Sequence, residues 1–364
     1  MDTHEENPFP PNHGAEQDGT ASPSPERTST AVPPVTPPPE PPKPSPITNS
    51  KTYSPQPDFP SLVEFIENYK PRPDFSYDMP KLDSITNGLH RKELIIVGGR
   101  PNEGKTSIAI QWAWMLAKKG KKVVFFSNEM HRATLWVKIL ARETQIAQGN
   151  ILTDRISENE RELLFTTFNH LMVGKGLYIY DHQEGTTRMD IVRILAKEKP
   201  DVFFIDHLQM VKTDKQFQKR NEAIEEIVNQ TKLWADKMNC TGILLSQCSR
   251  STEGRKNYLP FLSDLKGSGA IEEVADLVLL IAWPWKTVAP RDLEAITDEK
   301  ERQKVEAEKA KYKEDEFYLE IAKNRMGGVG IVKLKFLKDK SLFLEEGQFF
   351  DREIPQEKQW YNDK

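Results

Sequence analysis

Leu94-Ile95-Ile96-Val97-Gly98-Gly99-Arg100-Pro101-Asn102-Glu103-Gly104-Lys105-Thr106-Ser107 is the stretch that decides the fold of this chain. An apolar run typical of a buried strand leads into a loop that fits the pattern G-x-x-x-x-G-K-T, and apolar residues with helical spacing follow from Ser107. Strand, loop and helix in this order are the context in which the pattern forms a phosphate-binding P-loop. A chance glycine-rich turn is the alternative, and the agreement of all three elements favours the P-loop.

The side chains of this loop predict how a nucleoside triphosphate and Mg²⁺ are held. Gly99 and Gly104 let the backbone turn its N–H groups toward the phosphates, and the N-terminus of the following helix favours negative charge. Lys105 is expected to reach the β- and γ-phosphates, and the Thr106 hydroxyl to hold Mg²⁺. The expected nucleotide-binding residues are Gly99, Arg100, Pro101, Asn102, Glu103, Gly104, Lys105, Thr106 and Ser107.

Proline separates the first 60 residues from the rest of the 364-residue chain. Of 26 prolines, 17 lie in 1–60, together with eight acidic and three basic residues and almost no aliphatic ones. Such a segment cannot bury enough apolar surface to offset the entropy of ordering, so we expect disorder with polyproline II character near 33–46. The formal charge of residues 1–60 is −5 and that of the whole chain is −4, which leaves about +1 for residues 61–364. A nucleic-acid site in this nearly neutral part must therefore be a local basic patch.

Cysteine content and hydropathy indicate a cytoplasmic protein. Cys240 and Cys248 lie in or beside apolar segments without a His/Cys cluster, which favours reduced, buried thiols over a metal site. The longest apolar run, Leu277–Trp285, is too short to cross a bilayer. The acidic, proline-rich N-terminus has no apolar core of a signal peptide.

Apolar strands alternate with amphipathic helices after residue 61, which predicts an α/β domain whose mainly parallel sheet has helices on both faces. Strands are expected at 93–98, 122–127, 177–180, 202–205, 242–246, 277–283, 317–322 and 330–336, the last two as an antiparallel extension at one edge. Helices are expected at 105–119, 131–145, 157–173, 187–198 and 218–238. The predicted division is a disordered tail at 1–60, a linker helix at 61–74, one large domain at 75–350 with a charged, solvated helical insertion at 287–316, and a C-terminal tail at 351–364.

Three more polar side chains follow predicted strands, where parallel sheets bind ligands. Asp206 ends one strand and is expected to hold Mg²⁺ beside the P-loop, rather than merely to cap the strand. Glu129 follows another and can polarise the attacking water, although an acid favoured by a helix N-terminus is the alternative. Gln247 follows a third and can contact the γ-phosphate, unless it is a plain surface residue.

These motifs together resemble the RecA-like motor domain of the DnaB family of hexameric replicative DNA helicases. For example, Ile205-Asp206-His207-Leu208-Gln209 resembles the family's Ile-Asp-Tyr-Leu-Gln, and Ser127-Asn128-Glu129-Met130 resembles its Ser-Leu-Glu-Met, whose Glu is the catalytic base. The resemblance spans roughly 75–340 in family order, and the segments that carry it are 82–89, 99–106, 127–130, 205–209, 246–250, 262–272 and 321–325.

The resemblance implies an ATP-driven, ring-shaped DNA helicase, usually of six subunits, that translocates on single-stranded DNA and unwinds duplex during replication. ATP with Mg²⁺ would lie at each subunit interface, and Lys323 and Arg325 would reach the neighbour's γ-phosphate. The expected catalytic residues are Lys105, Glu129, Gln247, Arg325 and Lys323.

Two loops are expected to line a central channel and contact the DNA backbone with little sequence specificity. The glycines of the second loop would let backbone N–H groups approach phosphates. The first loop contributes Lys212, Lys215 and Lys219, and the second contributes Arg250, Arg255, Lys266, Gly267 and Gly269; a solvated surface is the alternative for each lysine.

The sequence departs from the family in three respects. The tail stands where the family has a helical collar, and it is a candidate site for a primase, a loader or a single-strand binding protein. His207 stands where the family has Tyr, as in the bacteriophage primase-helicase branch, and we interpret it as a packing variation. Lys266-Gly267 replaces Arg-Glu. A recombinase-type or regulatory DNA-dependent ATPase without unwinding activity is the alternative function, and a decayed motor acting as a scaffold is disfavoured by the intact motifs.

Overall fold

A computed structural model describes residues 73–172, 176–182, 185–213, 217, 220–249, 259–288 and 298–347. The predicted tails at 1–60 and 351–364 lie outside these residues. Of the predicted linker helix at 61–74, only Pro73 and Asp74 are described, and neither is helical. No described helix has the length and apolar character needed to cross a membrane.

One nine-stranded sheet organises the described domain, in the order β3-β2-β4-β5-β1-β6-β7-β8-β9. The first six strands in this order are parallel, and β7, β8 and β9 extend one edge in antiparallel fashion. The strands are β1 (Leu94–Gly99), β2 (Val123–Ser127), β3 (Leu177–Asp181), β4 (Val202–Asp206), β5 (Thr241–Gln247), β6 (Leu277–Ala282), β7 (Glu316–Asn324), β8 (Gly330–Leu337) and β9 (Leu342–Glu345).

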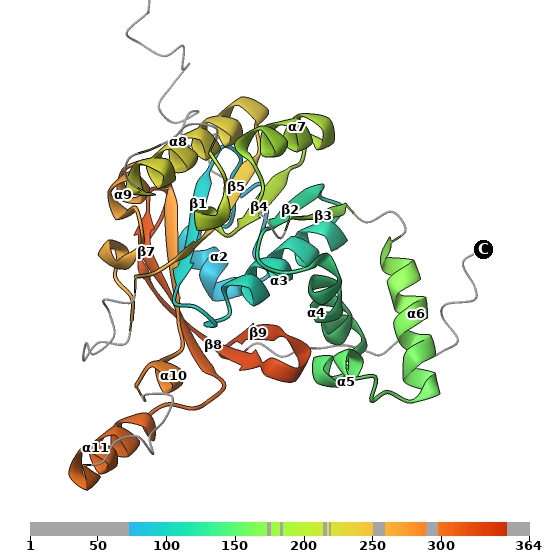
Figure 1. The fold of residues 1–364 in the computed structure, drawn as a ribbon, viewed down its shortest axis with the longest axis vertical. Coiled ribbons are helices and arrows are strands. Elements are labelled where there is room, and N and C mark those ends of the chain that lie inside the picture. The colour runs from blue at the N-terminus through green and yellow to red at the C-terminus, as the bar shows by residue number, and fades with distance from the viewer. Residues whose placement is uncertain are drawn as a thin grey trace, which may run out of the picture. The chain divides into compact units, whose positions relative to one another are not determined.

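Helices cover both faces of this sheet (Figure 1), as the alternating pattern predicts. The helices are α2 (Pro80–Thr86), α3 (Lys105–Lys118), α4 (Arg132–Thr144), α5 (Gln148–Leu152), α6 (Glu158–Met172), α7 (Arg188–Glu198), α8 (Arg220–Met238), α9 (Ser268–Val274), α10 (Pro284–Val288) and α11 (Glu299–Lys309). Local caps mark several starts: Thr187 and Asp190 form a capping box at α7, and the Asp298 side chain accepts backbone N–H groups at α11.

Successive residues of β1 face two separate cores. Ile95 and Val97 pack with α3 and α4, whereas Leu94 and Ile96 pack with α7, α8 and α9. Every residue of β1 is buried, because a central parallel strand is covered on both sides. This explains why the strand before the P-loop reads as a continuous apolar run rather than an alternating one.

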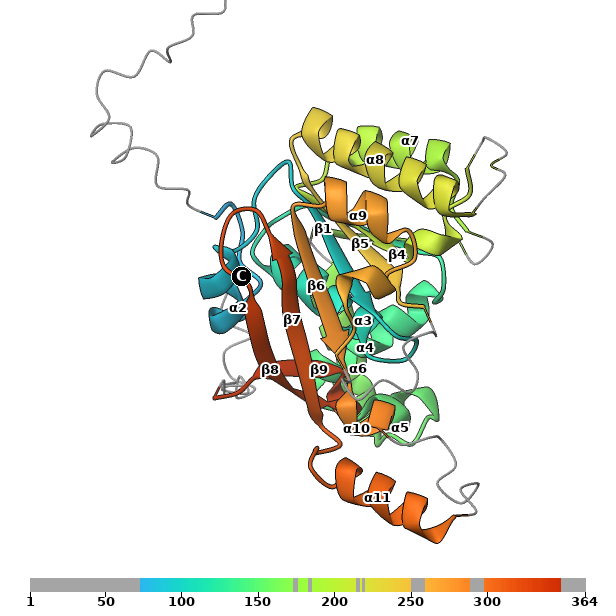
Figure 2. The ribbon, with the colours of Figure 1, turned by 90° about the vertical axis from the view of Figure 1, so that its left-hand side faces the viewer.

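The expected strands and helices are confirmed with ends shifted by a few residues. The antiparallel extension is confirmed and has one more strand than expected, β9, whose four residues are too short to give a periodic signal. The predicted insertion at 287–316 overlaps the end of α10, which starts at Pro284. Its second helix, α11, has no buried residue and is held by pairs such as Arg302–Glu299, as expected of a solvated helix. Figure 2 shows α11 beyond the ends of β7 and β8.

Both thiols are buried and free, as predicted. Burial raises the pKa of Cys240 and of Cys248 to about 12, so neither is a thiolate at neutral pH.

Candidate nucleotide-binding site

Sheet order brings the predicted strand-end residues together. β2, β4, β5 and β1 are consecutive neighbours, and Ser127 pairs with Asp206 while Gly99 pairs with Gln247. Because the four strands are parallel, the segments that follow them lie along one edge of the sheet. The P-loop, Glu129, Asp206 and Gln247 therefore converge there, as predicted.

The two P-loop glycines are needed for different reasons. Gly104 has φ of +86° and caps the N-terminus of α3, which a side chain would strain. Gly99 has ordinary extended geometry, but a Cβ there would lie 2.7 Å from Ile281 Cγ2 and 2.8 Å from the Ile281 carbonyl oxygen. Gly99 therefore also allows close packing against β6, beside the predicted role in the phosphate loop.

Lys105 is folded back onto its own loop. Its Nζ donates to the carbonyl oxygens of Gly99, at 3.0 Å, and of Arg100, at 2.7 Å. Burial lowers the pKa of this ammonium, and the nearby acids, Glu103 first, oppose that shift. The side chain lines the pocket, so a phosphate there offers the buried charge a stronger partner than two carbonyls.

Thr106 and Asp206 form the candidate Mg²⁺ site. The Thr106 hydroxyl donates to Asp206 Oδ2 at 2.7 Å, across 100 residues of sequence. Burial raises the pKa of Asp206 to about 6. A hydroxyl and a carboxylate oxygen are ligands that Mg²⁺ takes, directly or through water, so the residues fit this ion.

Glu129 contacts His207. His207 Nδ1 and Glu129 Oε2 are 3.0 Å apart, and this hydrogen bond is the main cause that lowers the pKa of the Glu129 carboxyl. His207 is buried, whereas the Glu129 side chain is half exposed. His207, interpreted from the sequence as a packing variation, also contacts the expected catalytic base through its ring. Three atoms that could bind a metal ion, one from each of Glu129, Asp206 and His207, lie within 4.8 Å of one another.

Gln247 reaches the pocket from the end of β5. Gln209 links it to β4, because Gln209 Nε2 donates to Ser246 Oγ at 3.0 Å and Gln209 Oε1 accepts the Gln247 N–H at 3.3 Å. The Gln247 carbonyl in turn accepts the N–H of Lys266 at 3.5 Å. A chain of hydrogen bonds thus joins the nucleotide edge to the second predicted DNA loop.

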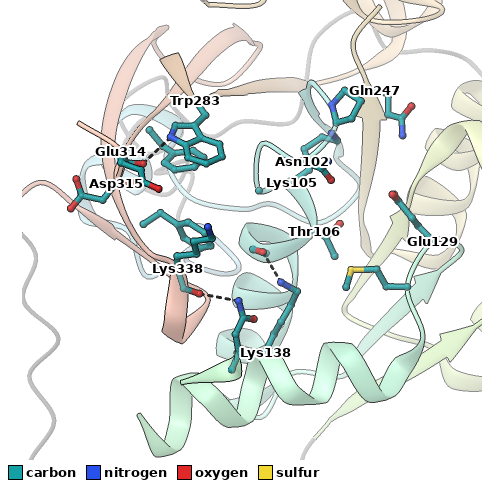
Figure 3. Close-up of a pocket in the computed structure, with 17 residues that line it drawn as sticks. Asn102, Lys105, Thr106, Glu129, Lys138, Gln247, Trp283, Glu314, Asp315 and Lys338 are labelled. Carbon is teal, nitrogen blue, oxygen red and sulfur yellow. Dashed lines mark hydrogen bonds between the residues drawn. The ribbon is translucent and has the colours of Figure 1, made fainter. Parts of the chain in front are cut away.

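A pocket of about 590 Å³ joins these residues to an aromatic wall (Figure 3). Trp283 stacks on Phe317 with ring centroids 5.0 Å apart, and Phe336 packs against the same Phe317. Lys138, from α4, donates to Ser107 Oγ at 3.1 Å on the opposite wall. Sequence reasoning missed this wall. The feature of the sequence that could have indicated the aromatic wall is the position of Trp283, directly after β6, the strand that neighbours β1.

Two side chains of helix α10 form hydrogen bonds with the P-loop. Lys286 Nζ donates to the carbonyl oxygens of Pro101, at 3.0 Å, and Asn102, at 3.2 Å. The Thr287 hydroxyl donates to Glu103 Oε1 at 3.0 Å, and the buried Glu103 carboxylate also accepts the Arg100 N–H at 3.0 Å. The start of the insertion therefore fixes the shape of the phosphate loop.

Lys323 and Arg325 lie at the opposite end of the sheet from the P-loop of the same chain, since Lys323 pairs with Val278 near the start of β6. Lys323 Nζ donates to the carbonyl oxygens of Glu272 and Ala275. Arg325 forms an ion pair with Asp276 at 2.8 Å. Neither cation lines the pocket of its own chain.

The predicted DNA loops are described in part. Lys215, Lys219, Arg250 and Arg255 lie outside the described residues, whereas Lys212, Lys266, Gly267 and Gly269 lie within them. Gly267 has φ of +78° at the N-terminus of α9, and a Cβ there would overlap Ile224 Cγ2 of α8. A Cβ on Gly269 meets nothing within 4 Å. Helix packing therefore explains Gly267 without any phosphate, and leaves Gly269 unexplained.

Comparisons with known proteins show the family. Residues 75–345 match the family model described as the DnaB-like helicase C terminal domain. The chain is 31% identical over 303 residues to the replicative DNA helicase DnaB of Helicobacter pylori strain J99, covering 76% of this chain and 62% of that protein. It is 30% identical over 281 residues to DnaB of Geobacillus stearothermophilus, covering 76% and 57%. The chain thus spans about three-fifths of the length of these relatives.

Two solved structures share the fold. One is an ATPase domain, which matches with a TM-score of 0.63 at 24% identity, covering 78% of this chain and 96% of that one. The other is a DnaB-like replicative helicase, studied with its interactions with primase, which matches with a TM-score of 0.64 at 24% identity, covering 78% and 64%. These likenesses confirm the predicted RecA-like α/β fold.

Proposed function

The chain belongs to the DnaB-like helicase C-terminal domain family, and from that membership and its site we propose that it is an ATP-driven, ring-forming DNA helicase of replication. One observation carries the proposal. Lys105, Thr106 and Glu129 follow strand ends far apart in the sequence and line one pocket, and the buried Asp206, from a third strand end, joins them through its hydrogen bond to Thr106.

In the proposed mechanism, Lys105 exchanges its two carbonyl partners for the β- and γ-phosphates of ATP. Thr106 and Asp206 would hold Mg²⁺, which when bound would offset the charge of the phosphates. Glu129 accepts a proton from the attacking water, and Gln247 contacts the γ-phosphate. Gln247 then transmits the loss of that phosphate to Lys266 through its backbone carbonyl.

The aromatic wall provides a place for the base. Trp283 and Phe336 are both partly exposed and both packed on the buried Phe317, and they offer apolar ring surface at the far side of the same pocket, on which a purine can stack. Glu314 and Asp315 border this side and add hydrogen-bond acceptors.

Lys323 and Arg325 are proposed to act on the nucleotide of a neighbouring subunit in a ring of six. Support comes from their position, since they lie at the end of the sheet away from their own P-loop. On assembly Arg325 would exchange Asp276 for the neighbour's γ-phosphate, which couples hydrolysis to contact between subunits.

Single-stranded DNA in the channel is the proposed substrate, contacted by the loops that carry Lys212 and Lys266. We retain the predicted division at 1–60, 61–74, 75–350 and 351–364, with the tail as a recruitment segment for a primase, a loader or a single-strand binding protein. A protein that acts on replicating DNA in a bacterium or an infected host works in the cytoplasm, which is the location we propose.

Unwinding of a forked duplex tests the proposal, with wild type and Lys105→Ala compared at equal nucleotide and Mg²⁺ and with the mass of the complex measured alongside. We expect strand separation by a hexamer that requires ATP and is lost in the variant. DNA-stimulated hydrolysis without strand separation, even on a fork, would instead favour the recombinase-type or regulatory ATPase.

A further inference from the structure

His207 is a residue beside this site whose chemistry the proposed mechanism does not use. It directly follows Asp206 at the end of β4, and its side chain is only 7% exposed. An imidazole in this position has two ring nitrogens, and Nδ1 lies 3.0 Å from Glu129 Oε2. A carboxylate only accepts hydrogen bonds, so this contact makes Nδ1 the donor.

Glu129 itself has little to hold it. It lies between β2 and α4, outside any helix or strand, and its side chain is 52% exposed. A free carboxylate on such a segment samples several rotamers, and each productive hydrolysis step then requires one of them to be selected.

The backbone around this pair is fixed, which makes His207 a suitable anchor. The Asn128 N–H donates to the Asp206 carbonyl at 2.7 Å, and the Met210 N–H donates to the His207 carbonyl at 3.0 Å. Ser127 Oγ donates to the Met130 carbonyl at 2.5 Å on the other side of Glu129. Both ends of the Glu129 segment are thereby tied down, and only the carboxylate needs a further restraint.

We propose that His207 is a positioning residue that holds Glu129 Oε2 through its Nδ1–H, leaving Oε1 to accept the proton of the attacking water. The inference rests on the proposed function. Figure 3 shows Glu129 on the same side of the pocket as Gln247, so the carboxylate held in this way borders the γ-phosphate end. The ring acts only through Glu129 and does not itself contact nucleotide.

Two substitutions of matched shape separate the hydrogen bond from packing. His207→Asn keeps an N–H donor near the position of Nδ1, whereas His207→Leu has nearly the same shape as Asn and no donor. Neither changes the Asp206 or Thr106 side chains. We would measure kcat and KM of DNA-stimulated ATP hydrolysis, nucleotide affinity, ring mass and thermal unfolding for both variants.

We expect His207→Leu to lower kcat by roughly 10- to 100-fold, less than the roughly 100- to 10,000-fold that a general base contributes because the base itself remains, with KM and nucleotide affinity within about twofold of wild type. His207→Asn is expected to recover most of that loss. In a Glu129→Gln background the Leu substitution should have no further effect on kcat, because the group that it positions is gone.

Other results overturn the inference. An unchanged kcat in His207→Leu, equal losses in Leu and Asn accompanied by weaker nucleotide binding or a lower melting temperature, or a full additional loss in the Glu129→Gln background would each assign His207 a structural role. Tight Zn²⁺ binding by wild type without nucleotide, lost in both His207 variants, would assign Glu129, Asp206 and His207 to a metal site instead. Absence of any ATP hydrolysis by wild type would contradict the proposed function itself. A failure of the proposed function can thus be distinguished from a failure of the inference about His207.

Discussion

Gly267 and Gly269 provide a direct test of whether the second DNA loop is shaped by helix packing or by DNA. The perturbation is Gly267→Ala, with Gly269→Ala as its matched control two residues away. At Gly267 the backbone has φ of +78°, and an added Cβ would overlap Ile224 Cγ2 and lie 3.2 Å from Ile224 Cβ. At Gly269 the added Cβ meets nothing within 4 Å.

The magnitude follows from two costs at Gly267. Left-handed backbone costs a non-glycine residue about 1–2 kcal/mol. Overpacking against the buried Ile224, which is 2% exposed, costs about 1–3 kcal/mol more. Gly267→Ala should therefore lower the free energy of unfolding by about 2–5 kcal/mol, whereas Gly269→Ala, inside α9, should raise it by about 0.5–1 kcal/mol.

Urea denaturation at fixed protein concentration measures both variants, because unfolding of an oligomer depends on concentration. In an Ile224→Ala background the overlap with Ile224 Cγ2 disappears and only the 3.2 Å contact with the Cβ of residue 224 remains, so the cost of Gly267→Ala should fall toward the backbone part of about 1–2 kcal/mol. Equal stability of the Gly267 and Gly269 variants would refute the packing argument. If Gly267→Ala unfolds like wild type and loses only DNA binding, the phosphate-contact role holds instead.

Three further outcomes follow from the site. Arg325→Ala should spare nucleotide binding and remove DNA-stimulated turnover, and full turnover in this variant would show that the trans assignment is wrong. Asp206→Asn should abolish Mg²⁺-dependent hydrolysis and stabilise the ligand-free protein. Burial raises the pKa of Asp206 in the folded protein to about 6 from 3.8. The protonated carboxyl therefore makes its full contribution to the free energy of unfolding below about pH 4, and this contribution is lost as the pH rises through 6. Urea titrations at several pH values should show that the free energy of unfolding of Asp206→Asn exceeds that of wild type by up to about 3 kcal/mol at pH 8. A lower free energy of unfolding for the variant than for wild type at pH 8 would contradict this expectation. Trp283→Ala should weaken ATP binding about two- to tenfold in equilibrium titrations and leave inorganic triphosphate unaffected, since stacking contributes about 0.5–1.5 kcal/mol. Equal losses for both ligands would exclude a base contact.

The sequence predicted the fold class and the nucleotide edge because both depend on short-range patterns. Continuous apolar strands, helical periodicity and the glycines around Lys105 are all encoded within a few residues. Placing Asp206 and Glu129 at the same edge required only that parallel strands end on one side of a sheet.

Other features of the site have no such local signal. Trp283 reaches the nucleotide pocket because β6 lies beside β1, and the short strand β9 forms only against β8. The clamp of Thr287 on Glu103 joins residues 184 positions apart. None of these contacts could be predicted from periodicity, because each depends on the order of strands in the sheet.

His207 shows most clearly what the sequence by itself determined and what only tertiary structure decided. Its place after an apolar strand and beside Asp206 follows from the sequence through local strand geometry. Its contact with Glu129 spans 78 residues and arises because β2 and β4 pair in parallel with Ser127 opposite Asp206. A side chain's chemical type is local, whereas its partner depends on which strands the folded chain places side by side.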